Sequence, residues 1–187
     1  MAHVLVACAT APGSAREIAD HVVERLKAAG HVVSLVDART ATRTELGWFD
    51  AAILAGAFNA GQNRAALSDF VRSHRYELER VPTAFIAVIP LSAAGVGWRH
   101  AGADADLAQF FAGLGWSAGR VHVTSGVARE TVAEWLERLI GQSVLWPGSA
   151  GEAAAAIHPV DWDALDSFTD RFLAEEIEPA ARQGQTI

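Results

Sequence analysis

The sequence predicts a doubly wound α/β fold, a five-stranded parallel sheet with strand order 2-1-3-4-5 and helices on both faces. Two observations predict it. Short apolar runs without polar alternation are typical of strands covered on both faces, and segments with apolar residues every three to four positions stand between them. Because strand and helix alternate, right-handed crossovers are required, and these make the sheet parallel.

The first half of the chain begins with an apolar strand at His3–Cys8, followed by an amphipathic helix at Ala15–Ala29. Gly30 stands directly after this helix, as is usual at a helix C-terminus. The second strand is predicted at His31–Val36. After a polar link, Ala51–Ala57 is again continuously apolar and predicts the third strand.

The second half continues the alternation with a helix at Arg64–Leu78. Pro82 introduces a fourth strand at Thr83–Ile89. Apolar residues at helical spacing then predict a helix through Leu107–Leu114, and Gly119–Thr124 predicts the fifth strand.

A single domain is predicted over residues 1–187, with a helical insertion at 129–160 between the fifth strand and the last helix. Within the insertion, Arg129–Gly141 has helical spacing, and a Gly-, Pro- and Ala-rich stretch follows at Ser143–Ala156. Asp161–Glu175 is the last helix, with its apolar stripe on the sheet. Its acidic residues are expected to face water: Asp163, Asp166 and Asp170.

Composition excludes several classes of function. The chain has 15 basic and 22 acidic residues, a net charge of -7 and no run of Lys or Arg, which excludes a nucleic-acid-binding surface. No apolar run reaches the roughly 20 residues of a membrane span, and the chain starts without a signal-peptide pattern. With a single Cys, these features predict a cytoplasmic protein. The seven His residues lack metal-ligand spacing, so no metal site is predicted.

A ligand is expected at the carboxyl ends of the first and third strands, where the predicted strand order reverses. Three loops meet there: Ala9–Ser14, Ala57–Asn63 and Pro90–His100. The first loop joins a strand to a helix through a glycine turn, so free backbone N–H groups and the helix dipole favour an anion such as phosphate. The alternative is an ordinary turn, with Ser14 as N-cap and Glu17 completing a capping box.

Four short motifs, in order along the chain, carry a family resemblance. Gly13 precedes Arg16-Glu17-Ile18-Ala19, Asp50–Gly56 leads to Gly61, and Pro82-Thr83-Ala84-Phe85 and Asp161-Trp162 follow. With these motifs the chain resembles the flavodoxin family and, within it, the flavodoxin-like menaquinone-dependent protoporphyrinogen dehydrogenases. The resemblance implies FMN bound by the three loops and electron transfer to or from the flavin.

The resemblance implies a set of candidate cofactor-binding residues in the three loops. They are Thr10, Ala11, Pro12, Gly13, Ser14, Ala15, Ala57, Phe58, Asn59, Ala60, Leu91, Ser92, Ala93 and Trp98. Phosphate would be held by Thr10, Gly13 and Ser14, and the ring would be flanked by Phe58 and Trp98. Pro12 and Ala15 stand where the family has hydroxyl side chains, and Pro12 also removes a backbone N–H.

Two functions are therefore open: an FMN-dependent oxidoreductase or electron-transfer protein, including one of the protoporphyrinogen dehydrogenase type, and a flavodoxin-like domain without FMN that binds a partner or small ligand. No side chain is predicted to act as acid or base, because the flavin would carry the redox chemistry. The sequence also leaves open whether the protein uses a redox partner or a quinone, and whether it forms a homodimer.

Several other residues have a structural interpretation beside a functional one. Cys8 is expected in the core, since buried free Cys is common, and His100 is the one His worth testing for function. Four arginines are expected on a solvated helix face, although they could meet an acidic partner or porphyrin propionates: Arg64, Arg72, Arg75 and Arg80.

Overall fold

The computed structural model describes residues 1–9, 14–41, 48–57, 62–89, 101–125 and 160–179. Its five strands form one sheet in the order β2-β1-β3-β4-β5, and every neighbouring pair is parallel. The strands are β1 His3–Ala9, β2 Val32–Asp37, β3 Ala51–Ala57, β4 Thr83–Ile89 and β5 Arg120–Ser125. The predicted fold class and strand order are confirmed.

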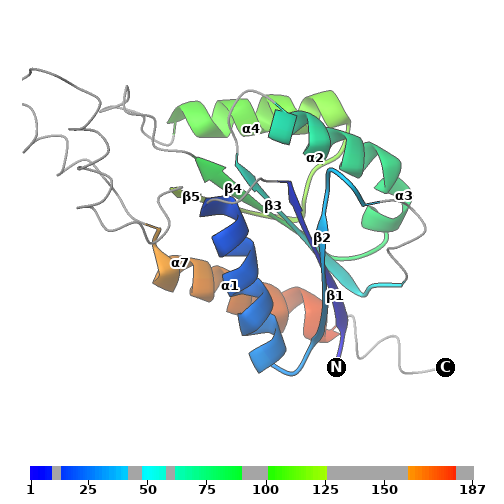
Figure 1. Cartoon of the computed structure of the whole chain (residues 1–187), viewed down its shortest axis with the longest axis vertical. Coiled ribbons are helices and arrows are strands. Elements are labelled where there is room, and N and C mark those ends of the chain that lie inside the picture. Colours follow the sequence, from blue (N-terminus) through cyan, green and yellow to red (C-terminus); the bar gives the residue numbers. More distant parts are fainter. Residues whose placement is uncertain (10–13, 42–47, 58–61, 90–100, 126–159, 180–187) are drawn as a thin grey trace, which may run out of the picture.

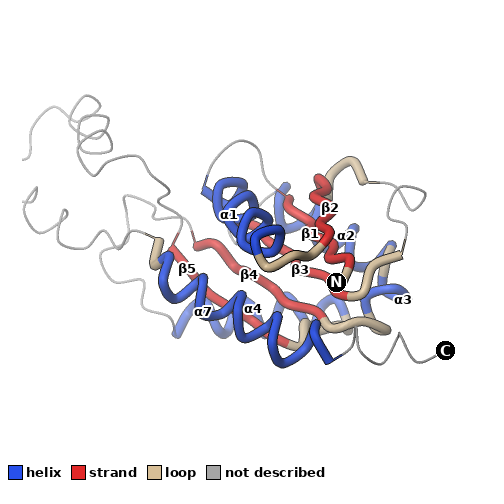
Figure 2. Tube along the Cα trace, turned by 90° about the horizontal axis from the view of Figure 1, so that it is seen from below, coloured by secondary structure: helices blue, strands red, loops and turns tan. Residues whose placement is uncertain are grey.

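Helices cover both faces of this sheet (Figures 1 and 2). One face carries α1 Ser14–Ala28 and α7 Trp162–Phe172, which continues as a π-helical turn, η2 Leu173–Ile177. The other face carries α2 Gln62–Ser73, α3 Arg75–Leu78 and α4 Ala101–Leu114. The predicted insertion at 129–160 lies, except for Val160, outside the described residues.

The alternation of side chains along each strand divides the core into two layers. In β1, Val4, Val6 and Cys8 face the layer under α1 and α7. Leu5 and Ala7 face the layer under α2 and α4. All five are at most 3% exposed. The strand is buried on both faces, which is why its sequence shows no polar alternation.

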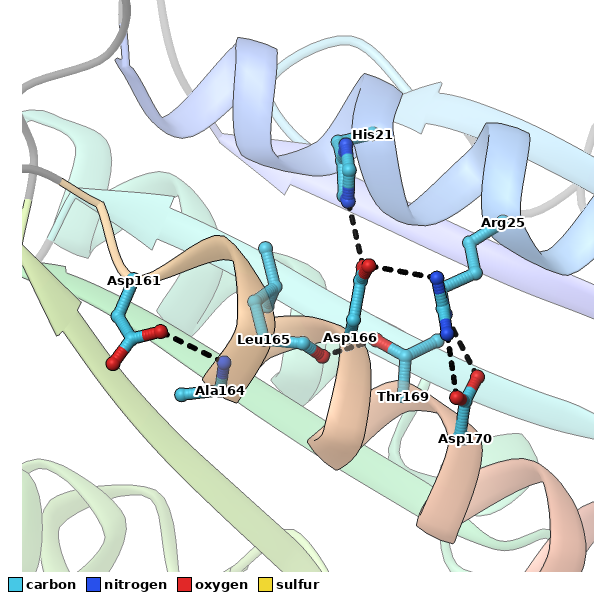
Figure 3. Close-up of polar contacts among 8 residues, drawn as sticks. All are labelled: His21, Arg25, Asp161, Ala164, Leu165, Asp166, Thr169 and Asp170. Carbon is cyan, nitrogen blue, oxygen red and sulfur yellow. Dashed lines mark hydrogen bonds and ion pairs between the residues drawn. The ribbon is translucent and has the colours of Figure 1, made fainter.

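An ionic cluster joins α7 to α1, the two helices that cover the same face of the sheet (Figure 3). Arg25 donates to Asp166 at 2.7 Å and to both carboxylate oxygens of Asp170, at 2.7 and 2.5 Å. His21 Nε2 lies 2.7 Å from the other oxygen of Asp166. The prediction that these aspartates face water is wrong for Asp166, whose side chain is 26% exposed because it lies between the two helices.

The predicted helix Arg64–Leu78 is interrupted at His74, between α2 and α3. His74 has φ -116° and ψ 20°, and its Nδ1 bonds the Phe70 carbonyl at 2.9 Å. A side chain that bonds the preceding turn competes with regular helical geometry, and such a bond is not visible in apolar periodicity. The last helix begins as predicted, since Asp161 accepts the Ala164 N–H at 2.9 Å as its N-cap.

Candidate functional site

The candidate site lies at the carboxyl edge of the sheet, between the ends of β1 and β3. Ala9, the last residue of β1, is in register with Gly56, one residue before the end of β3. The chain leaves β1 toward α1 on one face of the sheet and leaves β3 toward α2 on the other (Figure 1). This divergence makes the edge a topological switch point, the place where open α/β sheets bind ligands.

Of the predicted site residues, the structure describes Ala57, Ala15 and the backbone of Ser14. Ala57 is half-buried at the end of β3, and Ala15 is 2% exposed in the core layer under α1. The others lie outside the described residues, so their roles stay predictions: Thr10, Ala11, Pro12, Gly13, Phe58, Asn59, Ala60, Leu91, Ser92, Ala93 and Trp98. His100 also lies outside them.

The described residues at the ends of β1 and β3 are small. Ala9, Gly56 and Ala57 supply no bulky side chain there. Gly56 also lets α2 approach closely, because a Cβ at this position would lie 2.4 Å from Leu67 Cδ1 and 3.9 Å from the Ala9 carbonyl oxygen. A side chain at residue 56 therefore forces Leu67 or α2 to move.

The first turn of α1 faces this edge and carries both signs of charge. The helix begins at Ser14, and its first turn contains Arg16 and Glu17. Glu17 is favourable there, because the free N–H groups of a helix N-terminus attract negative charge. Arg16 is not, and its only hydrogen-bond partner among the described residues is Asp20, whose carboxylate oxygens lie 3.0 and 3.1 Å from Arg16 Nε.

Cys8 lies under this first turn as a neutral thiol. It is 3% exposed, and its Sγ lies 3.8 Å from the Ala15 carbonyl oxygen. Burial raises the pKa of the Cys8 thiol to about 11, against the opposing charge of Arg16. The predicted core position of Cys8 is confirmed. The thiolate fraction at neutral pH is too small for nucleophilic chemistry.

A second ion pair, between Arg39 and Asp37, lies at the end of β2, next to β1. Arg39 donates to Asp37 through its backbone N–H at 2.9 Å, through Nε at 3.0 Å and through Nη2 at 2.6 Å. Hydrogen bonding from the Arg39 side chain lowers the pKa of Asp37. Arg39 is therefore engaged at several atoms, whereas Arg16 holds its carboxylate through a single nitrogen.

The four arginines in and directly after α2 and α3 have partners within the protein. Arg72 pairs with Asp69 inside α2 at 3.4 Å, and Arg75 pairs at 2.6 Å with Glu79, the residue that follows α3. Arg80 donates to the Tyr76 hydroxyl and lies over its ring. Arg64 lies over the Phe110 ring at 5.4 Å. These contacts favour the solvated-face interpretation over an anion-binding surface.

Neither a membrane span nor a cluster of metal ligands occurs in the described part of the chain. None of its helices combines the length and the apolar character that crossing a bilayer requires. No three His, Cys, Asp or Glu side chains gather there in a way that could hold a metal ion.

The sheet order, the two helical layers and the switch point beside α1 define the class: a doubly wound α/β domain with its topological switch point between β1 and β3. The chain belongs to the flavodoxin domain family, whose model matches residues 5–152.

The comparisons with individual proteins agree with this family. Protoporphyrinogen IX dehydrogenase [quinone] of Escherichia coli K12 is 22% identical over 165 residues, covering 88% of this chain and 91% of the relative. A flavodoxin of Streptococcus pneumoniae TIGR4 has a TM-score of 0.54 at 18% identity, covering 92% of this chain and 99% of its own. Flavodoxin 2 of Bacillus cereus has a TM-score of 0.51 at 16% identity, with the same coverage. These two structures share the fold.

Proposed function

We propose that the protein binds FMN at the carboxyl edge of the sheet and transfers electrons through it. The observation that carries the proposal is the family match over residues 5–152, together with a switch point bordered by small residues at the ends of β1 and β3. The first turn of α1 adds a second argument, since its N–H groups and positive dipole end suit a phosphate.

The described residues fit such a cofactor. Ala57, which is small and half-buried at the end of β3, would meet a planar ring with little side-chain bulk, while Ala9 and Gly56 are buried, and the start of α1 at Ser14 would supply N–H donors for the phosphate. Thr10, Gly13 and Ser14 would hold the phosphate, and Phe58 and Trp98 would cover the ring and keep water from it. When bound, FMN supplies one- and two-electron redox chemistry, while the protein binds and orients it.

The finer proposal is a dehydrogenase of the protoporphyrinogen type that passes electrons to a quinone. It is supported by the 22% identity to the E. coli protein across 88% of this chain. In such an enzyme the flavin would carry the redox chemistry, and substrate specificity would come from the surface around it. We further propose that the protein works in the cytoplasm.

Purification of the full-length chain tests the proposal. A flavin absorbance band in the purified protein, or a rise in melting temperature on addition of FMN, is expected. FMN at 100 times its dissociation constant stabilises the folded chain by about 2.7 kcal/mol, which at this size raises Tm by about 5–10 °C.

A colourless protein whose Tm FMN leaves unchanged would contradict FMN binding and favour the FMN-free partner- or ligand-binding module. If FMN binds, oxidation of protoporphyrinogen IX with a quinone as acceptor tests the finer proposal. If dithionite reduces the bound flavin but the protein does not oxidise protoporphyrinogen IX, electron transfer stays the proposed function and the proposed dehydrogenase activity is refuted.

A further inference from the structure

The strand β2 forms one edge of the sheet, beside β1. Each of its residues is at least partly exposed, whereas β1, β3 and β4 are almost entirely buried. The Val32 N–H donates to the Ala2 carbonyl at 2.9 Å, and the register with β1 continues unbroken to Asp37. Because successive backbone groups of a strand point to opposite sides, the N–H and C=O groups of Val33 and Leu35 point away from β1. Among the described residues they have no partner on that side.

The outward side of Val32–Val36, the β2 edge, has none of the features that usually protect an edge strand. The run is aliphatic apart from Ser34 and contains no Lys, Arg or Pro. Natural proteins place such residues, or a bulge, on exposed edges, because a bare edge pairs with another strand. The opposite edge of the sheet, β5, begins instead with Arg120, which forms ion pairs with residues of η2. Of the two edges, β2 is therefore the one suited to strand pairing.

With a two-fold axis at Ser34, β2 is complementary to an antiparallel second copy of itself. Val33 then faces the partner's Leu35, and the two residues exchange backbone hydrogen bonds through the groups that point away from β1. On the other face of the sheet, Val32 faces the partner's Val36. Aliphatic cross-strand pairs of this kind stabilise a sheet. Because each copy presents the same surface, the pairing closes at two copies.

The same register sets a donor against an acceptor at both ends of the strand, where His31 faces the partner's Asp37. Nδ1 of His31 accepts the Ala2 N–H at 3.3 Å, so Nε2 carries the proton and can donate. The Asp37 carboxylate is 29% exposed and keeps acceptor capacity beside its ion pair with Arg39. An axis one residue further along would instead set Asp37 against an aliphatic side chain, the partner's Val33.

Trp48 adds an exposed aromatic ring beside the axis. Its side chain is 95% exposed. Its carbonyl oxygen accepts a hydrogen bond from Nδ1 of His3 at 2.5 Å, and Nε2 of the same ring lies 2.8 Å from the Ser34 hydroxyl. Tryptophan is enriched in the buried centres of protein interfaces. An exposed indole so close to Ser34 favours a protein partner at this edge.

We propose that two copies of this chain associate through the β2 edge and form one continuous sheet across a two-fold axis at Ser34. Backbone hydrogen bonds supply the affinity, and the side chains that face each other across the axis fix the register. The inference does not depend on FMN, because the β2 edge is part of the folded chain without a ligand. Its failure would leave the proposed function unchanged.

Sedimentation equilibrium of the full-length chain measures the association. The mass is expected to rise with concentration from 19.8 kDa to twice that value. Val32→Lys should return the mass to that of one chain, because a lysine on the edge would have to leave water to face the partner's Val36. Val121→Lys is the matched control and should leave the mass unchanged. Val121 lies on β5, the other edge strand, and is 43% exposed, against 48% for Val32.

Cysteine cross-linking tests the register. In an antiparallel pair, opposite residues that do not share hydrogen bonds have Cα atoms about 4.5 Å apart, a separation that a disulfide can bridge. Ser34→Cys in a Cys8→Ala background is therefore expected to form a disulfide with the same position of the partner under mild oxidation. A covalent dimer should appear on a denaturing gel. Val121→Cys in the same background should stay a single chain.

A mass of 19.8 kDa at every concentration up to about 100 μM, roughly a hundredfold above a micromolar dissociation constant, would overturn the inference. A dimer that Val32→Lys leaves intact, or that Val121→Lys dissociates, would also overturn it, since another surface would then hold the copies together. So would a Ser34→Cys variant that cross-links no faster than Val121→Cys. Circular dichroism verifies that each variant is folded, and the cross-linking decides the question if Val32→Lys does not fold.

Discussion

Substitution of Gly56 by alanine tests how closely α2 is packed on β3 at the edge of the candidate site. The added Cβ would lie 2.4 Å from Leu67 Cδ1, well inside van der Waals contact, and Leu67 is fully buried. The substitution therefore forces a buried side chain out of its place. The backbone is compatible with alanine, because Gly56 does not have a positive φ.

Two opposing effects set the size of the change. Overpacking a core costs about 1–3 kcal/mol, and replacing glycine by alanine returns about 0.4–1 kcal/mol by restricting the unfolded chain. We expect Gly56→Ala to lower the free energy of unfolding by about 1–2 kcal/mol. Leu67→Ala alone should cost about 2–5 kcal/mol by leaving a cavity.

The double variant distinguishes the steric explanation from others. If the methyl group added at residue 56 enters the space that Leu67 vacates, the two losses will sum to about 1–2 kcal/mol more than the loss in the double variant. Urea unfolding followed by circular dichroism measures all four proteins. Gly113→Ala is the control, since a Cβ there meets nothing within 4 Å inside α4 and should stabilise by about 0.5–1 kcal/mol. Additive losses at residues 56 and 67 would contradict the steric explanation.

Three further predictions concern single side chains. Burial lowers the pKa of His122, whose ring is stacked 5.0 Å from that of Phe168; the charge of Asp161 opposes this shift and that of Arg171 adds to it. Because the pKa is lowered in the folded state, the unfolded chain binds more protons, and the free energy of unfolding should fall as pH drops below about 6.5. His122→Phe should reduce this pH dependence of the unfolding free energy, measured by urea unfolding between pH 7 and pH 5. An unchanged pH dependence would mean that another group causes it. Asp161→Ala should destabilise by about 0.5–2 kcal/mol through loss of the α7 N-cap, with Asp161→Asn near wild type, and equal losses in both variants would exclude capping as the cause. With its pKa raised to about 11 by burial, Cys8 should react with a disulfide reagent at pH 8 only after unfolding, and fast labelling of the folded chain would show the thiol to be accessible.

The strands could be predicted from sequence because burial on both faces leaves a direct pattern. Ala51–Ala57 is continuously apolar, and the structure has β3 at those residues. Alternation with helices and the rule of right-handed crossovers predicted a parallel, doubly wound sheet, and 2-1-3-4-5 was chosen from the strand orders that such a sheet allows. Local side-chain bonds were not predictable in the same way, as the interruption at His74 shows.

Contacts between distant residues were the least predictable part. Asp166 was expected in water, yet it binds His21 and Arg25, which lie 145 and 141 residues earlier. No periodicity in α7 alone contains that information, because the partner is on another helix. Arg16 was recognised as part of a family motif, but its weak pairing with Asp20 became visible only in the structure.

Calorimetric titration of the flavin-free full-length chain with FMN is the decisive measurement for the proposed function. We predict saturable binding of one FMN per chain, tighter than the binding of riboflavin. Absence of binding at about 1 mM FMN, where even a complex with a standard binding free energy of about -4 kcal/mol is half formed, would contradict it.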